Sequence, residues 1–164
     1  MSRRILIIGS PGAGKSTFSR RLAAQTGLPL HHLDAIYWRS DRTHLTREEL
    51  VAQLMPVLES SSWIIDGNYN GTLPLRLRYC TEVIMLDYPL DVCIAGIHSR
   101  TGQIRSDMPW VEDKVDEDFL AFVKAFPEQI RPQIHALMAQ YPEIPFTVLT
   151  ARADAEHYLN ALKP

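Results

Sequence analysis

GSPGAGKST, at residues 9–17, follows directly on the apolar run ILII at residues 5–8. It completes the pattern G-x-x-x-x-G-K-[ST], in which glycines let successive backbone N–H groups point inward at phosphate oxygens. In such a loop the lysine, here Lys15, bridges the β- and γ-phosphates, and the hydroxyl residue after it, here Ser16, ligates Mg²⁺. The stretch therefore predicts a site for a nucleoside triphosphate with Mg²⁺.

The sequence on both sides of this loop predicts a strand that enters it and a helix that leaves it. Residues 15–26 place Phe18 and Leu22 on one helical face, and Gly27 is the expected C-terminal cap. Short apolar runs then alternate with amphipathic stretches, the pattern of repeated strand–helix units around a parallel sheet. We expect strands at residues 4–8, 29–33, 63–66, 82–86 and 146–149.

Two further helical regions are predicted. Thr46 and Glu49 form a capping box that begins a helix over residues 47–59. The stretch from 116 to 141 has helical periodicity in two pieces, and we expect Pro127 to start the second piece.

Composition indicates an ordinary globular protein. The chain has 164 residues, of which 46% are hydrophobic, and a net charge of −2. That length favours a single domain, residues 1–164, and that charge disfavours direct nucleic-acid binding. Two cysteines are too few for a disulfide framework, and the N-terminal apolar run is too short for a signal peptide. No segment is long enough to cross a membrane, so we expect the cytoplasm.

Acidic residues at strand ends are candidates for the metal and the substrate, because the carboxyl ends of parallel strands meet at one edge of the sheet. Asp66, followed by Gly67, is the preferred second metal residue, and Asp87 is its competitor. Asp34 is a candidate for positioning a phosphoryl acceptor. His31 and His32 alternate faces on a strand, so we expect packed or solvent-facing histidines rather than two ligands of one metal.

Arginines are the candidates for stabilising transferred charge, because phosphoryl transfer develops charge on the equatorial oxygens. Arg100 and Arg105 belong to a stretch, 98–115, that has little apolar periodicity and reads as a bare connection or a lid. Arg131 is a third candidate. Arg76 and Arg78 diverge if their stretch is helical, so at least one of them should be structural.

Several motifs together resemble a known family. They are the phosphate loop, HLDAIYW ending at residue 38, WIIDGNY at 63–69, LPLRLRYCTEVIMLDYP ending at 89, R-x-D-M at 105–108 and FPEQIRP ending at 132. The chain is similar to small P-loop kinases of the adenylate kinase type, and most similar to the family called DNA topology modulation protein. That resemblance implies the strand order 2-3-1-4-5, a role for Asp66 in holding water on the metal, and lid arginines at Arg100 and Arg105.

The sequence thus predicts a three-layer α/β/α P-loop fold with a five-stranded parallel sheet, an acceptor-side helical segment at 35–62 and a short lid segment at 98–115. The expected function is transfer of the γ-phosphate of ATP to an unidentified small molecule or nucleotide. The alternatives are a nucleotide-dependent switch and a protein acting on DNA topology. The sequence does not distinguish ATP from GTP as the nucleotide. The segment ending at Arg152 is either a place for the base or an exposed helix start. The candidate catalytic residues are Lys15, Asp34, Arg100, Arg105 and Arg131. The candidate metal residues are Ser16 and Asp66. The candidate nucleotide-binding residues are Gly9, Pro11, Gly12, Ala13, Gly14, Lys15, Ser16, Thr17 and Arg152.

Overall fold

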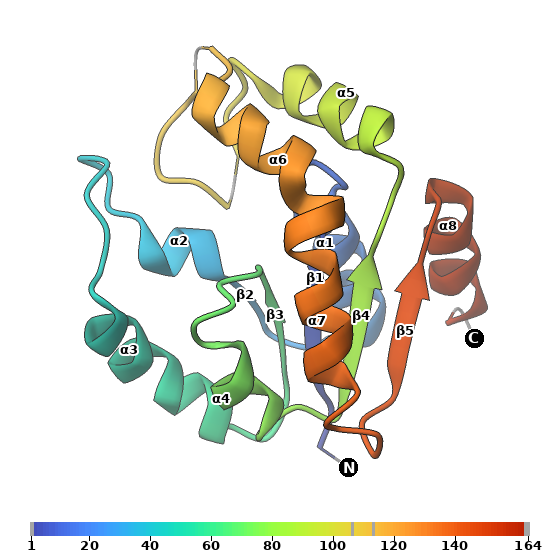
Figure 1. Ribbon diagram of the computed structural model, residues 1–164. Helices are drawn as coiled ribbons and strands as arrows, with labels where there is room; N and C mark the ends of the chain where they lie inside the picture. The colour runs from blue at the N-terminus through green and yellow to red at the C-terminus, as the bar shows by residue number, and fades with distance from the viewer. Residues whose placement is uncertain (1, 106, 113, 163–164) are drawn as a thin grey trace.

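The computed structural model describes residues 2–105, 107–112 and 114–162. Strands and helices alternate along most of the chain (Figure 1). The elements are, in order, β1 (Arg4–Gly9), α1 (Lys15–Thr26), β2 (Leu30–His32), α2 (Leu33–Tyr37), α3 (Arg47–Glu59), β3 (Trp63–Asp66), α4 (Leu73–Leu77), β4 (Glu82–Leu86), α5 (Leu90–Arg100), α6 (Glu117–Gln129), α7 (Arg131–Met138), β5 (Phe146–Leu149) and α8 (Arg152–Ala161).

The sheet has five strands in the order β2-β3-β1-β4-β5, and every neighbouring pair is parallel. This is the predicted fold class and strand order. In the centre of the sheet, Leu6 of β1 is in register with Ile65 of β3 and Val83 of β4. These strands are apolar along their whole length because helices cover both faces of a parallel sheet.

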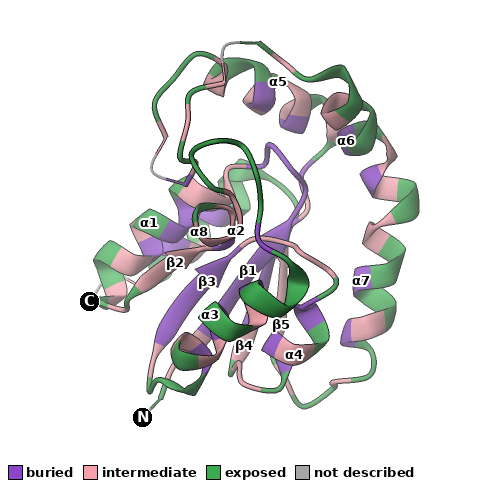
Figure 2. Ribbon diagram, turned by 90° about the vertical axis from the view of Figure 1, so that its left-hand side faces the viewer, coloured by how far each residue is buried: buried purple, intermediate pink, exposed green. Residues whose placement is uncertain are grey.

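Each face of the sheet has its own hydrophobic core. Leu6 and Ile8 of β1 pack on the side of α3, α4 and α7, whereas Ile5 and Ile7 pack on the side of α1, α5 and α8. Helix α6 contributes to both cores, through Phe126 to the first and Val123 to the second. Figure 2 shows the central strands buried between helices that expose their outer faces. The three-layer arrangement follows from this alternation of inward-facing side chains.

The helix boundaries largely follow the sequence signals. Helix α1 begins after Gly14, whose φ is 91°, and ends at Gly27, whose φ is 74°. Helix α3 begins at Thr46, whose hydroxyl accepts a hydrogen bond from the backbone N–H of Glu49 at 3.1 Å. A side-chain oxygen that accepts from the third residue of a helix is the expected N-terminal cap.

The expected boundary at Pro127 is wrong. Pro127 lies inside the last turn of α6, and the break comes at Ile130, with Pro132 in the first turn of α7. Proline is well tolerated in a first turn because its missing N–H has no helical partner there. Phe126, directly before this proline, is only 1% exposed, and its burial favours continuation of α6 past Pro127.

The carboxyl ends of the strands bring the candidate site together. The phosphate loop follows β1, α2 follows β2, the loop at 67–71 follows β3, and α5 begins soon after β4. The predicted lid segment, 98–115, consists of the last turn of α5 and an irregular stretch, within which residues 106 and 113 lie outside the described part. This stretch passes over the same edge of the sheet (Figure 1).

Candidate active site

The phosphate loop is tightly packed on β4 and α5. Gly9 and Gly12 have φ values of 139° and 82°, which favour glycine. A Cβ on Gly9 would lie 2.1 Å from the carbonyl oxygen of Leu86, and one on Gly12 would lie 2.2 Å from that of Cys93. Ser10 N–H donates to the same Leu86 oxygen at 2.9 Å. The glycines are therefore required by close backbone contact as well as by φ.

A cavity of about 1110 Å³ opens above this loop. Single small-molecule sites usually have volumes of about 300–1,000 Å³, so this cavity has room for more than one small ligand. Most of the predicted site residues line it. They are Pro11, Gly12, Gly14, Lys15, Ser16, Thr17, Asp34, Asp66, Arg100, Arg105 and Arg152. Gly9, Ala13 and Arg131 are not among its lining residues.

Lys15 rests on its own loop. Its ammonium donates to the carbonyl oxygens of Gly9 at 3.2 Å and Ser10 at 3.1 Å. Desolvation lowers the pKa of Lys15, and the carboxylates of Asp34 and Asp66 offset part of this shift. Phosphate oxygens are stronger acceptors for an ammonium than carbonyls are, so a nucleotide can take over these hydrogen bonds.

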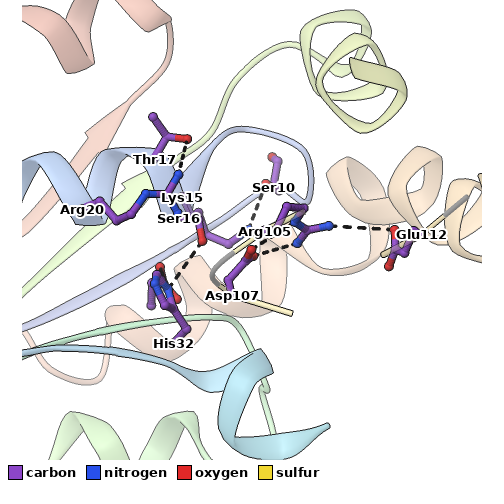
Figure 3. A network of polar contacts seen from close by, with 10 residues as sticks. Ser10, Lys15, Ser16, Thr17, Arg20, His32, Arg105, Asp107 and Glu112 are labelled. Atoms are coloured by element: carbon purple, nitrogen blue, oxygen red, sulfur yellow. Dashed lines mark hydrogen bonds and ion pairs between the residues drawn. The ribbon is translucent and has the colours of Figure 1, made fainter. Parts of the chain in front are cut away.

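Ser16 and Asp66 converge on one side chain, His32 of β2. His32 Nδ1 lies 3.5 Å from Ser16 Oγ (Figure 3), and it lies 2.8 Å from Asp66 Oδ2. Asp66 is 5% exposed. The competitor, Asp87, instead pairs with the guanidinium of Arg131 at 2.7 Å and does not line the cavity.

The oxygens of Ser16 and Asp66 suit Mg²⁺. This ion prefers hard oxygen ligands and usually binds one or two protein oxygens while keeping waters and substrate phosphates. Over the described ranges, no group of three or more His, Cys, Asp or Glu side chains is arranged to hold a metal without such help. The pair is thus of the kind that binds Mg²⁺ together with a nucleotide.

Asn68, which the sequence did not single out, holds the start of the phosphate loop. Its carboxamide accepts from Gly9 N–H at 3.0 Å and donates to Gly9 C=O at 2.7 Å. Two hydrogen bonds to the backbone of one residue fix both the distance and the orientation between the loop at 67–71 and β1.

Arg76 supports the loop at 67–71 from below. It is fully buried and donates to the backbone carbonyls of Gly67, Asn68 and Tyr69. Burial lowers its pKa to about 9, so the guanidinium stays charged at neutral pH. Arg78 is exposed. Arg76 is therefore the structural arginine of this pair, in agreement with the expectation that at least one of the two is structural.

Asp34 lies at the start of α2 and faces the cavity. Burial raises its pKa, Lys15 opposes the shift, and the nearby charges of Asp107 and Asp66 add to it. Burial raises the pKa of the Tyr69 phenol, and the charge of Asp34 adds to this shift. Tyr69 has a φ of 33°, an uncommon value for a residue with a side chain, which aims it at this site.

The irregular stretch after α5 contributes an ion pair to the cavity lining beside the phosphate loop. Arg105 donates to both oxygens of Asp107, at 3.0 and 2.7 Å (Figure 3). Asp107 is 7% exposed. Burial raises the pKa of Asp107, but Arg105 and a hydrogen bond from Ser16 outweigh this and the net shift is downward. The pair therefore links this stretch to the proposed metal site.

Arg100 and Arg152 approach the cavity from α5 and α8. The Arg100 guanidinium lies 5.8 Å from the centroid of Phe119, and its Nε is buried without a hydrogen-bond partner among the described residues. Arg152 stands over Tyr88 at 5.8 Å. Guanidinium groups over aromatic faces keep their donors available for phosphate oxygens.

An aromatic contact joins the two segments that border the acceptor end. Trp38, just after α2, meets Trp110, in the stretch between α5 and α6, edge to face at 5.6 Å. Arg42 lies over the Trp110 ring at 5.5 Å. The acceptor-side segment and the predicted lid segment are thus in contact.

Asn68 and Asp107 are residues of this site to which the sequence assigned no role, whereas His32 was expected to be packed or solvent-facing and Arg76 was one of two candidates for a structural arginine. WIIDGNY and R-x-D-M contain Asn68 and Asp107, so the motifs marked those two positions without indicating what they contact.

No helix in the described part of the chain is both long and apolar enough to cross a membrane.

No family model matches the chain. It is 31% identical over 75 residues to the adenylate kinase of Clavibacter michiganensis subsp. michiganensis, which covers 46% of this chain and 36% of that protein. It is 29% identical over 98 residues to the adenylate kinase of Thermotoga neapolitana, which covers 58% of this chain and 44% of that protein. The chain therefore spans less than half the length of the curated relatives it matches.

Solved structures of kinases share the fold. Shikimate kinase from Bacteroides thetaiotaomicron superposes with a TM-score of 0.61 at 20% identity, over 99% of this chain and 97% of that one. A gluconokinase from Sinorhizobium meliloti 1021 superposes with a TM-score of 0.58 at 17% identity, over 98% and 93% of the two chains. At such low identity these likenesses show the fold alone.

Proposed function

We propose that the chain is a kinase that transfers the γ-phosphate of Mg·ATP to a small acceptor bound beside Asp34. The observation that carries the proposal is that the phosphate loop and the half-buried Asp34 line one cavity of about 1110 Å³. The similarity to adenylate kinases supports phosphoryl transfer as the reaction class.

In this proposal the nucleotide binds across the phosphate loop. The backbone N–H groups and Lys15 hold the phosphates, and Arg152 is the candidate contact for the rest of the nucleotide. Ser16 and Asp66 hold the Mg²⁺, directly or through water. When bound, the ion neutralises phosphate charge and holds the triphosphate in one geometry.

The acceptor side works mainly by positioning. Asp34 accepts a hydrogen bond from the acceptor hydroxyl and takes its proton as the bond to phosphorus forms. Tyr69 lines the same cavity as Asp34 and offers a hydroxyl that can donate a hydrogen bond there. Arg100 and Arg105 supply positive charge to the transferred phosphoryl group. The catalytic role of Arg131 stays a prediction. Its guanidinium is paired with Asp87, and Arg131 does not line the described cavity.

The resemblance to DNA topology modulation proteins rests on the motifs alone, and the net charge of −2 favours a small-molecule partner over nucleic acid. A nucleotide-dependent switch is the alternative activity. We also propose a cytoplasmic location.

Transfer of label from γ-labelled ATP tests the proposal. The assay contains Mg²⁺ and separate panels of nucleoside monophosphates, nucleosides and small hydroxyl compounds. Lys15→Ala should lower transfer at least about 100-fold, because one lost donor to a transition-state oxygen costs that much in comparable sites. Lys124→Ala, at an exposed position of α6, is the matched control and should keep full activity. Label released only as inorganic phosphate would favour the switch.

A further inference from the structure

We propose that the acceptor is an uncharged compound that offers a hydroxyl group, such as a nucleoside or a carbohydrate, and not a compound that already carries a phosphate. This inference rests on the proposed kinase function and concerns the acceptor end of the same cavity.

The cavity has enough positive charge for one nucleotide and little more. Its described lining holds five cationic side chains, Lys15, Arg20, Arg100, Arg105 and Arg152, against the carboxylates of Asp34, Asp66 and Asp107. The surplus is two positive charges. Mg·ATP carries a net charge of about −2, which this surplus balances. A phosphate monoester would add roughly −1.5 to −2 more with no cation left to match it.

The wall on the acceptor side offers hydrogen bonds and no cation. Beyond the phosphate loop, this wall is formed by Asp34 and by the loop residues Tyr69 and Asn70. Asn70 Oδ1 is buried and has no hydrogen-bond partner among the described residues. A buried acceptor without a partner is costly, and a ligand hydroxyl can satisfy it. A phosphate, which mainly accepts hydrogen bonds, cannot donate to it in its dianionic form.

Three arginines outside the cavity are engaged in other contacts. Arg76 lies fully buried beneath the loop with its donors on backbone carbonyls. Arg47 donates to the Gly71 carbonyl, and Arg39 pairs with Glu49 at 2.8 Å. These three arginines are absent from the described lining of the cavity. Recognition of a phosphate usually uses a guanidinium fork aimed at its oxygens, and the forks of these three arginines do not line the cavity.

Two carboxylates would also oppose a second phosphate. The charges of Asp34 and Asp107 are close enough to raise the pKa of Asp34. Arg105 is bound to both oxygens of Asp107 and lies 3.8 Å from Glu112, so its charge is largely matched. Like charges in a partly buried site repel strongly because the local dielectric is low. An uncharged acceptor avoids this repulsion.

Matched pairs of acceptors test the inference. Each pair shares its hydroxyl groups and differs by one phosphate: adenosine and AMP, guanosine and GMP, glucose and glucose 6-phosphate. ADP formation and the phosphorylated product are measured together. We expect the uncharged member of a pair to have the higher kcat/KM by at least about tenfold. The nucleoside pairs and the sugar pair then separate the two kinds of uncharged acceptor.

A variant of the wall provides an independent readout. Asn70→Leu should raise the KM of the uncharged acceptor by about tenfold, the effect of one lost hydrogen bond. The Kd of Mg·ATP, measured by calorimetry, should not change. A nucleoside monophosphate used in preference to its nucleoside would overturn the inference and leave the kinase function intact. ADP formed with inorganic phosphate and no phosphorylated product in any pair would overturn both.

Discussion

His32 Nδ1 lies 2.8 Å from Asp66 Oδ2, and this contact joins β2 to β3 at the proposed metal site. The same nitrogen lies 3.5 Å from Ser16 Oγ, so the ring stands between the two oxygens proposed to hold Mg²⁺. Burial lowers the pKa of His32, but the hydrogen bond and charge of Asp66 outweigh it and the net shift is upward. The ring therefore keeps a proton on Nδ1 for Asp66 and fixes the direction of that carboxylate.

Loss of this ring should weaken metal-dependent nucleotide binding. For His32→Ala we expect the Kd of ATP with Mg²⁺ to rise about tenfold, since residues that orient metal ligands contribute 10–100-fold to metal affinity. The Kd of ATP in EDTA should stay the same. Calorimetry measures both values, and His31→Ala is the matched control on the neighbouring residue. An equal rise in Mg²⁺ and in EDTA would contradict the role.

The pH dependence of transfer should report Asp34. Burial raises its pKa above 3.8, and the carboxylate form is the one that can accept a proton. Activity is therefore complete above this raised pKa and is lost as the pH falls through it. Asp34→Asn should lower kcat about 10²- to 10⁴-fold and remove this acid limb from the profile of kcat against pH. A variant that kept both kcat and the limb would exclude Asp34 as the base.

Burial of Arg76 predicts a large difference between two neighbouring arginines. Arg76→Met leaves the carbonyls of Gly67, Asn68 and Tyr69 without their donor, whereas Arg78→Met makes the same change at an exposed position. We expect the free energy of unfolding to fall by about 3 kcal/mol in the first variant and by less than about 0.5 kcal/mol in the second. Urea denaturation measures both; equal losses would show that the buried hydrogen bonds contribute little.

The contact between α5 and the phosphate loop leaves no room at Gly96. A Cβ there would lie 2.2 Å from the carbonyl oxygen of Gly12, whereas a Cβ on Gly71 would meet nothing within 4 Å. Gly96→Ala should therefore displace the loop, cost about 1–3 kcal/mol of stability and weaken ATP binding. Gly71→Ala should change neither quantity measurably. Thermal unfolding with and without Mg·ATP compares the two variants, and a Gly96→Ala protein with normal ATP affinity would show that the loop does not depend on this contact.

The fold was predictable because its signals are local. Buried parallel strands are apolar along their length, so β3, β4 and β5 begin and end at the expected residues. Thr46 and Gly27 marked helix ends through hydrogen bonds that span a few residues. The predicted helix boundary at Pro127 was wrong. A proline near the end of a helix removes only one hydrogen bond, and burial of the neighbouring Phe126 favours continuation of α6 past it.

The site was predictable only where sequence position implies spatial position. Asp34 and Asp66 follow strands, and parallel strands end at one edge, so their presence at the cavity could be inferred. The contacts of His32 with Asp66 and of Asn68 with Gly9 join residues 34 and 59 positions apart, through particular side-chain rotamers. Periodicity determines which face a residue occupies but not which partner its side chain reaches.

The contact of Trp38 with Trp110 gives the protein a built-in optical signal. The two indoles belong to the segment after α2 and to the stretch between α5 and α6, whereas Trp63 is fully buried in β3 and donates to the Leu58 carbonyl. When the segments part or close, the surroundings of Trp38 and Trp110 change while those of Trp63 stay constant. Intrinsic fluorescence can therefore follow the approach of the two segments during a reaction cycle without any attached dye.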